Sequence, residues 1–68
     1  MPEKWTGRLV GKMHNERVTQ NEIAAELGVG KAYVCMILSG KRNPPNAKER
    51  LNDAFNAVIA RRSHEERT

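Results

Sequence analysis

The sequence predicts a compact all-α domain of four or five helices, and three observations support this fold class. Apolar residues recur three and four positions apart along most of the 68-residue chain, which is the spacing of one helical face. Residues that cap helix N-termini precede two of these runs, and glycines follow two of them. The sequence has no strand-like alternation, internal repeat or low-complexity linker. We therefore expect one helical domain over residues 1–62 and a frayed or disordered tail over residues 63–68.

The first helix is expected from about Trp5 to Asn15. Its apolar stripe consists of Trp5, Leu9 and Met13. Gly7 and Gly11 weaken this helix, since each costs about 1 kcal/mol relative to alanine in a helix interior. Glycines four positions apart also allow a neighbouring helix to approach closely.

The second helix has the sharpest predicted start. Thr19 has the position of an N-cap, and Glu22 three residues later completes a capping box. Val18 and Ile23 flank this start as a hydrophobic staple. The helix should end at Gly28, because glycine adopts the left-handed conformation that terminates helices at little cost.

The third helix should begin after Gly30 and include residues 31–39, with Gly40 as its stop. Its core stripe consists of Val34, Ile37 and Leu38. On a helical wheel of about 100° per residue, Ala32, Met36 and Ser39 lie opposite this stripe, with Tyr33 and Cys35 on the flanks.

The fourth helix should start at Asn46 as N-cap, with Glu49 three residues later. It has the longest apolar stripe of the chain: Ala47, Leu51, Ala54, Phe55, Val58 and Ile59. Beyond Ala60 the apolar face ends, so the helix is expected to fray.

Positive charge is concentrated in one segment. The net charge is +4, from 12 basic and 8 acidic residues. No acid lies between Glu26 and Glu49, and this window contains Lys31, Lys41, Arg42 and Lys48. A basic excess can simply keep a surface solvated. Its segregation favours a polyanionic partner, most commonly a phosphate backbone, whose binding weakens steeply with salt.

Composition argues against several functional classes. One cysteine cannot form an internal disulfide, and the two histidines have no zinc-site spacing, so we expect no metal and no cofactor. No apolar run approaches the roughly 18 residues of a membrane span, and no signal segment is visible. A core this small supplies about 3 to 5 kcal/mol and cannot support an elaborate cleft. We expect a soluble cytoplasmic protein that is not an enzyme and binds no small-molecule ligand.

The stretch GVGKAYV, residues 28–34, has two incompatible interpretations. A phosphate-binding loop requires G-x-x-x-x-G-K-[ST] after a buried strand. Here Ala25 stands where the first glycine would be, Ala32 follows the lysine, and a capped helix precedes the segment. The stretch is therefore interpreted as a tight turn between two helices, an arrangement that can fit the second helix into a DNA major groove.

The segment TQNEIAAELGVGKAYVCMILSGKR resembles the Cro and phage-repressor (XRE-type) helix-turn-helix family. The resemblance is detailed over about residues 9–44, with the helix-turn-helix at about residues 19–39. The matching positions are Thr19, Gln20, Glu22, Ala24, Gly28, Val29, Val34, Ile37 and the segment SGKRNP. Family members often have serine or threonine at the position of Gly30, and an acidic residue at that of Leu38. The resemblance implies a lambda-repressor-like domain that binds double-stranded DNA.

Two sets of candidate site residues follow. The expected base-reading residues are Lys31, Ala32, Tyr33, Cys35 and Met36. The expected phosphate contacts are Thr19, Gln20, Ser39, Lys41, Arg42 and Asn43. Alternatives remain open: Cys35 and Met36 could pack against Trp5 or a partner subunit, and Tyr33 could cover the core edge. Lys31 and Gln20 could be ordinary surface residues.

The resulting functional hypothesis is a small repressor-like transcriptional regulator of prokaryotic phage or mobile-element type. The resemblance implies a homodimer on two half-sites, which forms in solution or only on DNA. The alternative is a protein-interaction or antitoxin-like module that uses Leu38, Met36 and the fourth helix.

Overall fold

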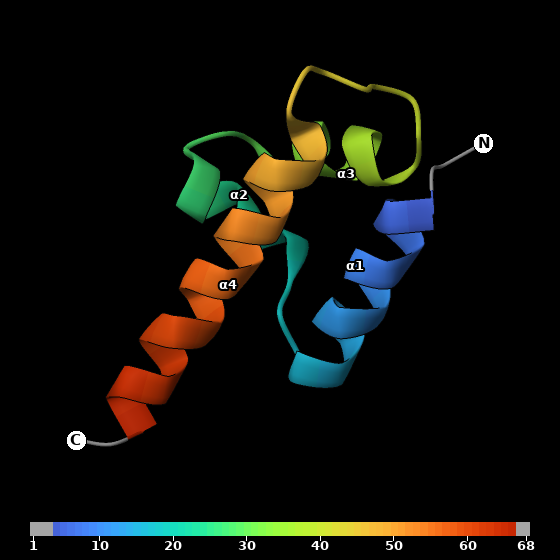
Figure 1. Ribbon diagram of the computed structural model, residues 1–68. Coiled ribbons are helices and arrows are strands. Elements are labelled where there is room, and N and C mark those ends of the chain that lie inside the picture. Colours follow the sequence, from blue (N-terminus) through green and yellow to red (C-terminus); the bar gives the residue numbers. More distant parts are fainter. Residues whose placement is uncertain (1–3, 67–68) are drawn as a thin grey trace.

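The computed structural model describes residues 4–66, and for residues 64–66 only the helical backbone. This part of the chain contains four helices and no strand, which confirms the predicted all-α class without a fifth helix (Figure 1). The helices are α1 (Lys4–Glu16), α2 (Gln20–Leu27), α3 (Lys31–Leu38) and α4 (Ala47–Glu66).

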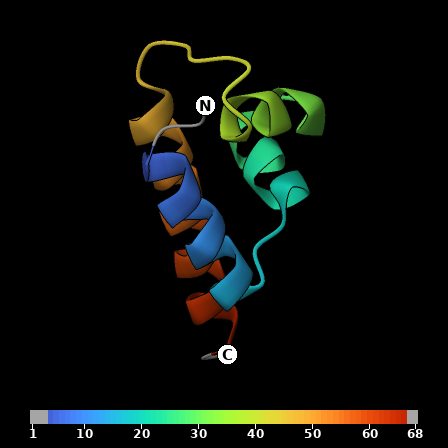
Figure 2. The same cartoon turned by 90° about the vertical axis from the view of Figure 1, so that its right-hand side faces the viewer.

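The helices enclose a single core. α2 packs against both α3 and α4, while α1 packs against α4 and α3. α1 and α4 both start at the end of the molecule where α3 and the loop after it lie (Figures 1 and 2). Most residues of the predicted stripes are buried, although Ile59 is only half-buried. The buried apolar residues are Leu9, Met13, Val18, Ile23, Ala24, Val34, Ile37, Leu38, Ala47, Leu51, Ala54, Phe55 and Val58. Trp5 is only half-buried and packs against this core from one side.

The first three helices end in the same way. A residue with positive φ follows each helix or its last cap: Arg17 (57°), Gly28 (72°) and Gly40 (85°). The next residue then donates its backbone N–H to a carbonyl five positions back: Val18 to Met13 (2.8 Å), Val29 to Ala24 (3.0 Å) and Lys41 to Met36 (2.9 Å). This arrangement is the Schellman motif, in which two backbone hydrogen bonds satisfy carbonyls that the helix leaves free. Glycine was expected at the second and third ends, whereas Arg17 adopts this conformation without being glycine.

Asn46 occupies the predicted N-cap position of α4, since the helix begins at Ala47 and the Asn46 carbonyl accepts the backbone N–H of Arg50 at 2.9 Å, but its conformation is unusual. An N-cap residue ordinarily has extended backbone, but Asn46 has a φ of 61°. The backbone N–H of Ala47 donates to the carbonyl of Pro44 at 3.2 Å, closing a turn with Pro45 and Asn46 at its centre. Proline followed by a residue with positive φ is the pattern of a type II turn, and asparagine tolerates this conformation. The two prolines therefore determine how α4 begins.

The C-terminal end of α4 also differs from the expectation. The helix continues to Glu66 instead of fraying beyond Ala60, although residues 67–68 lie outside the described part. Arg61 and Arg62 replace the apolar contacts at this end, since both form ion pairs with glutamates of α2. Tertiary ion pairs thus hold a turn that has no apolar face of its own.

Candidate functional site

α3 has one buried and one exposed face. Val34, Ile37 and Leu38 are 0%, 2% and 8% exposed. Lys31, Ala32 and Cys35 on the other side are exposed to solvent. Three of the five candidate base-reading residues therefore lie on an open surface.

The other two candidates are half-buried. Tyr33 packs against the hydrophobic core, so its ring covers the core edge, which was the alternative left open for this residue. Met36 is also half-buried. Leu38 joins the core, so it is not available to the protein-contact surface of the alternative hypothesis.

The N-terminus of α3 carries no compensating negative charge. Gly30 is its N-cap, with extended backbone and no side-chain hydrogen bond, and the first turn contains no acidic residue. The first backbone N–H groups of a helix have no partner within the helix, and the helix dipole makes this end positive. Lys31 adds a full positive charge at the same point. This end of α3 is electrostatically suited to an anion.

The C-terminus of α3 positions the basic loop that follows. The carbonyl of Met36 accepts hydrogen bonds from the backbone N–H groups of Lys41 (2.9 Å) and Arg42 (3.1 Å). These bonds hold the start of the loop against the helix, while the side chains of Lys41, Arg42 and Asn43 are exposed. Three predicted phosphate contacts are thus adjacent to the exposed face of α3.

Ser39 has a local partner in the structure. It lies just past α3 as the C-cap, and its exposed hydroxyl donates to the carbonyl of Met36 at 3.2 Å. A hydroxyl has one proton and can rotate, so a contact with phosphate would require it to turn away from the helix end. The phosphate contact of Ser39 stays a prediction.

Thr19 is likewise committed to local structure. Its hydroxyl accepts the backbone N–H of Glu22 at 3.2 Å and lies 3.3 Å from Oε1 of Glu22. Its own backbone N–H donates to the same Oε1 at 3.1 Å. The predicted capping box is confirmed, and it leaves Thr19 without a donor for a phosphate. Gln20, the first residue of α2, is half-buried.

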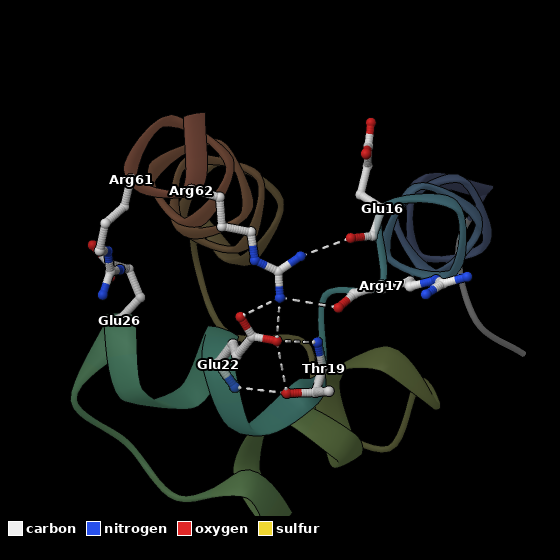
Figure 3. A network of polar contacts seen from close by, with 7 residues as sticks. All are labelled: Glu16, Arg17, Thr19, Glu22, Glu26, Arg61 and Arg62. Carbon is white, nitrogen blue, oxygen red and sulfur yellow. Dashed lines mark hydrogen bonds and ion pairs between the residues drawn. The ribbon is translucent and has the colours of Figure 1, made fainter. Parts of the chain in front are cut away.

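Arg62, which no sequence pattern had indicated as important, joins three helices. Nη2 of Arg62 lies 2.8 Å from Oε1 and 2.6 Å from Oε2 of Glu22. The same guanidinium donates to the carbonyls of Glu16 (2.7 Å) and Arg17 (3.0 Å) at the end of α1. Figure 3 shows this network, with the Arg61–Glu26 ion pair beside it. No local pattern could have identified it, because 40 residues separate Glu22 from Arg62.

The network keeps Glu22 ionised. The hydrogen bond from the Thr19 backbone N–H lowers the pKa of Glu22, partial burial opposes this, and the hydrogen bond and charge of Arg62 lower it further. The positive end of α2 is therefore occupied by the protein's own carboxylate. By contrast, the equivalent end of α3 has no such group. The N-terminus of α3 is thus open to an external anion, whereas that of α2 is not.

The described residues include neither a metal-binding cluster nor a membrane-spanning helix. No group of three or more histidine, cysteine, aspartate or glutamate side chains is arranged to hold a metal ion in residues 4–63. None of the helices between residues 4 and 66 has both the length and the hydropathy needed to cross a bilayer.

Comparison of the chain with protein-family models, curated proteins and solved structures finds no match. The geometry described above is therefore the basis for a functional assignment.

Proposed function

We propose that this protein binds double-stranded DNA sequence-specifically, with α3 inserted in the major groove. The observation that carries the proposal is the division of α3 into a buried face and an open face. The open face carries Lys31, Ala32 and Cys35, and an exposed basic loop follows the helix directly. Tyr33 and Met36 would contribute only their exposed edges.

The dimensions and chemistry of α3 support this assignment. An α-helix with its side chains is about 10 to 12 Å across, and the major groove is about 12 Å wide, so a helix such as α3 can lie in it. Small side chains allow the helix axis to approach base edges closely. The methyl of Ala32 suits a thymine methyl, while Lys31 can donate to the acceptor edge of guanine. The positive N-terminus of α3 adds a favourable interaction with the nearby backbone.

The basic loop supplies sequence-independent contacts. Lys41, Arg42 and Asn43 are exposed donors next to α3, and Gln20 adds an amide at the start of α2. Phosphate contacts of this type set register and carry no base information. Each neutralised phosphate contributes about −0.9 to the slope of log Kobs against log salt.

The biological role that we propose is a small cytoplasmic transcriptional regulator of repressor type. A chain of this size reads a short half-site, so two copies on half-sites about 34 Å apart would be needed to define an operator. Sequence selection from a random duplex library, followed by footprinting on the selected site, tests both claims. A footprint with two-fold symmetry is expected, and selection that enriches no sequence would remove the proposal.

Two substitutions sharpen this test. Ala32→Glu places a carboxylate on the open face of α3 and should reduce affinity for the selected site at least tenfold. Ala60→Glu makes the same change at an exposed position of α4 and should leave affinity within about twofold. Equal losses in both variants would argue for a general charge effect instead of groove insertion.

A protein partner is the second candidate, because Ala32, Cys35 and the exposed part of Met36 make the open face of α3 poor in charge. Buried interface centres are depleted in charged residues. Association with a protein that is insensitive to salt, in the absence of duplex binding, would favour this candidate.

A further inference from the structure

α1 presents a row of positive charges on the side that faces away from the core. Lys4, Arg8 and Lys12 are all exposed and follow one another at four-residue spacing. At 1.5 Å per residue this row is about 12 Å long. Its only acidic residue among positions 4–16 is the last one, Glu16. We call Lys4, Arg8 and Lys12 the α1 basic face.

Nothing inside the described protein compensates these charges. None of the three residues forms an ion pair with another residue in the range 4–63. Lys4 also stands at the N-terminus of α1, where the helix dipole disfavours a cation, and the first turn has no acid. The row therefore lowers the stability of the isolated helix.

Two glycines beside the row have no internal role either. Gly7 and Gly11 lie next to the α1 basic face on the helical wheel and are exposed. A Cβ added at either position would meet no atom within 4 Å, so no neighbouring helix uses the close approach that the sequence suggested. Neither has positive φ. Both disfavour the helix relative to alanine.

Unfavourable charge and unfavourable glycines thus coincide on one surface of one helix. Residues that disfavour their own helix, with no contact inside the protein that compensates for this, are typical of functional surfaces. We propose that the α1 basic face is a second, sequence-independent binding site for a nucleic-acid phosphodiester backbone. The cations would contact phosphates, and the glycines would let the sugar–phosphate chain lie close to the helix.

The composition of the surface favours this partner over other polyanions. A membrane-binding helix needs large apolar side chains beside its cations, and a stable protein interface needs an apolar centre. Here the cations are flanked by glycine. Val10, a large apolar side chain that is 45% exposed, is two positions from Arg8 and so lies on another side of the helix. α1 covers one side of the molecule and α2 with α3 another (Figure 2). One chain can therefore contact a duplex through α3 and a second backbone segment through α1.

The test uses the full chain and a labelled 20-base-pair duplex that lacks the selected site. The slope of log Kobs against log salt is negative. Its magnitude should fall by about 0.9 in Arg8→Gln and by about 1.8 in the double variant Arg8→Gln with Lys12→Gln. Arg50→Gln removes one charge from the exposed surface of α4, next to Glu49, and is the matched control. It should leave the slope unchanged, because a charge that contacts no phosphate releases no counterion on binding. Circular dichroism verifies that each variant is folded.

The same series in an Ala32→Glu background separates this inference from the proposed function. A reduced slope in both backgrounds supports the α1 site independently of α3. An unchanged slope in both overturns it, even when Ala32→Glu abolishes binding to the selected site. A loss of affinity for vesicles of anionic lipid without a loss for the duplex would also overturn it.

Replacing the two glycines distinguishes a role in binding from a purely structural role, because only a role in binding would change the affinity for the duplex. Gly7→Ala with Gly11→Ala should raise the thermal midpoint and at the same time weaken binding to the non-selected duplex by at least threefold. A raised midpoint with unchanged affinity would overturn the proposed close approach of the backbone.

Discussion

The guanidinium of Arg62 lies 2.6 Å from Oε2 of Glu22, and this contact connects the last part of α4 to the first turn of α2. The same side chain donates to two carbonyls at the end of α1. A helix has a partial negative charge at its C-terminus and a partial positive charge at its N-terminus. A cation at the first and a carboxylate at the second are therefore both stabilising. One ion pair thus stabilises three helix ends at a single point.

Loss of Arg62 should destabilise the fold measurably. Arg62→Gln removes the ion pair and weakens the bonds to the α1 carbonyls, and we expect a loss of about 1 to 2 kcal/mol. The expected loss of stability is small because the two side chains are 37% and 34% exposed, so solvent screens the ion pair. Urea denaturation measures the difference. Arg61→Gln is the control, since Arg61 is 57% exposed and should contribute less than about 0.5 kcal/mol. Equal effects would contradict a special role of Arg62.

Stability should depend on pH through Glu22. The pKa of Glu22 is lowered from 4.5 in the folded state, first by the Thr19 backbone N–H and then by Arg62, against partial burial. Below pH 4.5 the unfolded chain binds a proton before the folded protein does, so this contribution is present above that pH and is lost as the pH falls through the folded pKa. Urea denaturation of the unchanged protein and of Glu22→Gln between about pH 3 and 7 tests this. The difference in stability between them should shrink below pH 4.5, and a constant difference would refute the assignment.

Replacing Arg17 with glycine should stabilise the protein. Arg17 has a φ of 57°, a left-handed conformation that costs an ordinary residue about 1 kcal/mol and glycine almost nothing. Its contact with Arg62 uses the backbone carbonyl, which the substitution keeps. The expected gain is therefore about 0.5 to 1 kcal/mol in urea denaturation. Gly28→Ala makes the opposite change at a φ of 72° and should cost at least about 1 kcal/mol. Effects of the same sign would exclude backbone conformation as the cause.

Alkylation of Cys35 should block the proposed DNA binding. Cys35 is the single cysteine of the chain and is exposed on the open face of α3. Iodoacetamide attaches a carboxamidomethyl group there, which should lower affinity for the selected duplex at least tenfold, and bound duplex should slow the reaction. Cys35→Ala should bind the selected duplex with the same affinity before and after treatment with the reagent. Full binding by the alkylated protein would show that this face is not in contact with DNA.

Short-range features of the fold could be predicted well from the chain. Thr19 and Glu22 are three residues apart, so helix geometry alone brings their side chains together. The stops at Gly28 and Gly40 depend on the conformational freedom of single residues. The buried stripe of α3 follows from the spacing of its apolar residues at three and four positions. Its open face is the opposite side of the same helical wheel. These predictions succeeded because each concerns atoms that the local backbone already places close to one another.

Other features of the candidate site could not be read locally. Ser39 and Thr19 were expected to contact phosphate, but their hydroxyls bond to neighbouring backbone or side-chain atoms. The left-handed Asn46 depends on the turn that two prolines impose. In each case a polar residue had more than one possible partner or conformation, and the sequence alone did not rank them.

The amino-acid sequence by itself determined the four helices, three of their caps and the apolar residues of the core, because these depend on contacts within four or five positions. Only the tertiary structure decided that Arg62 meets Glu22 across 40 residues, that Tyr33 covers the core edge, and that no helix covers Gly7 and Gly11. Such contacts depend on how helices dock, which is determined by the packing of the whole core and not by any one segment.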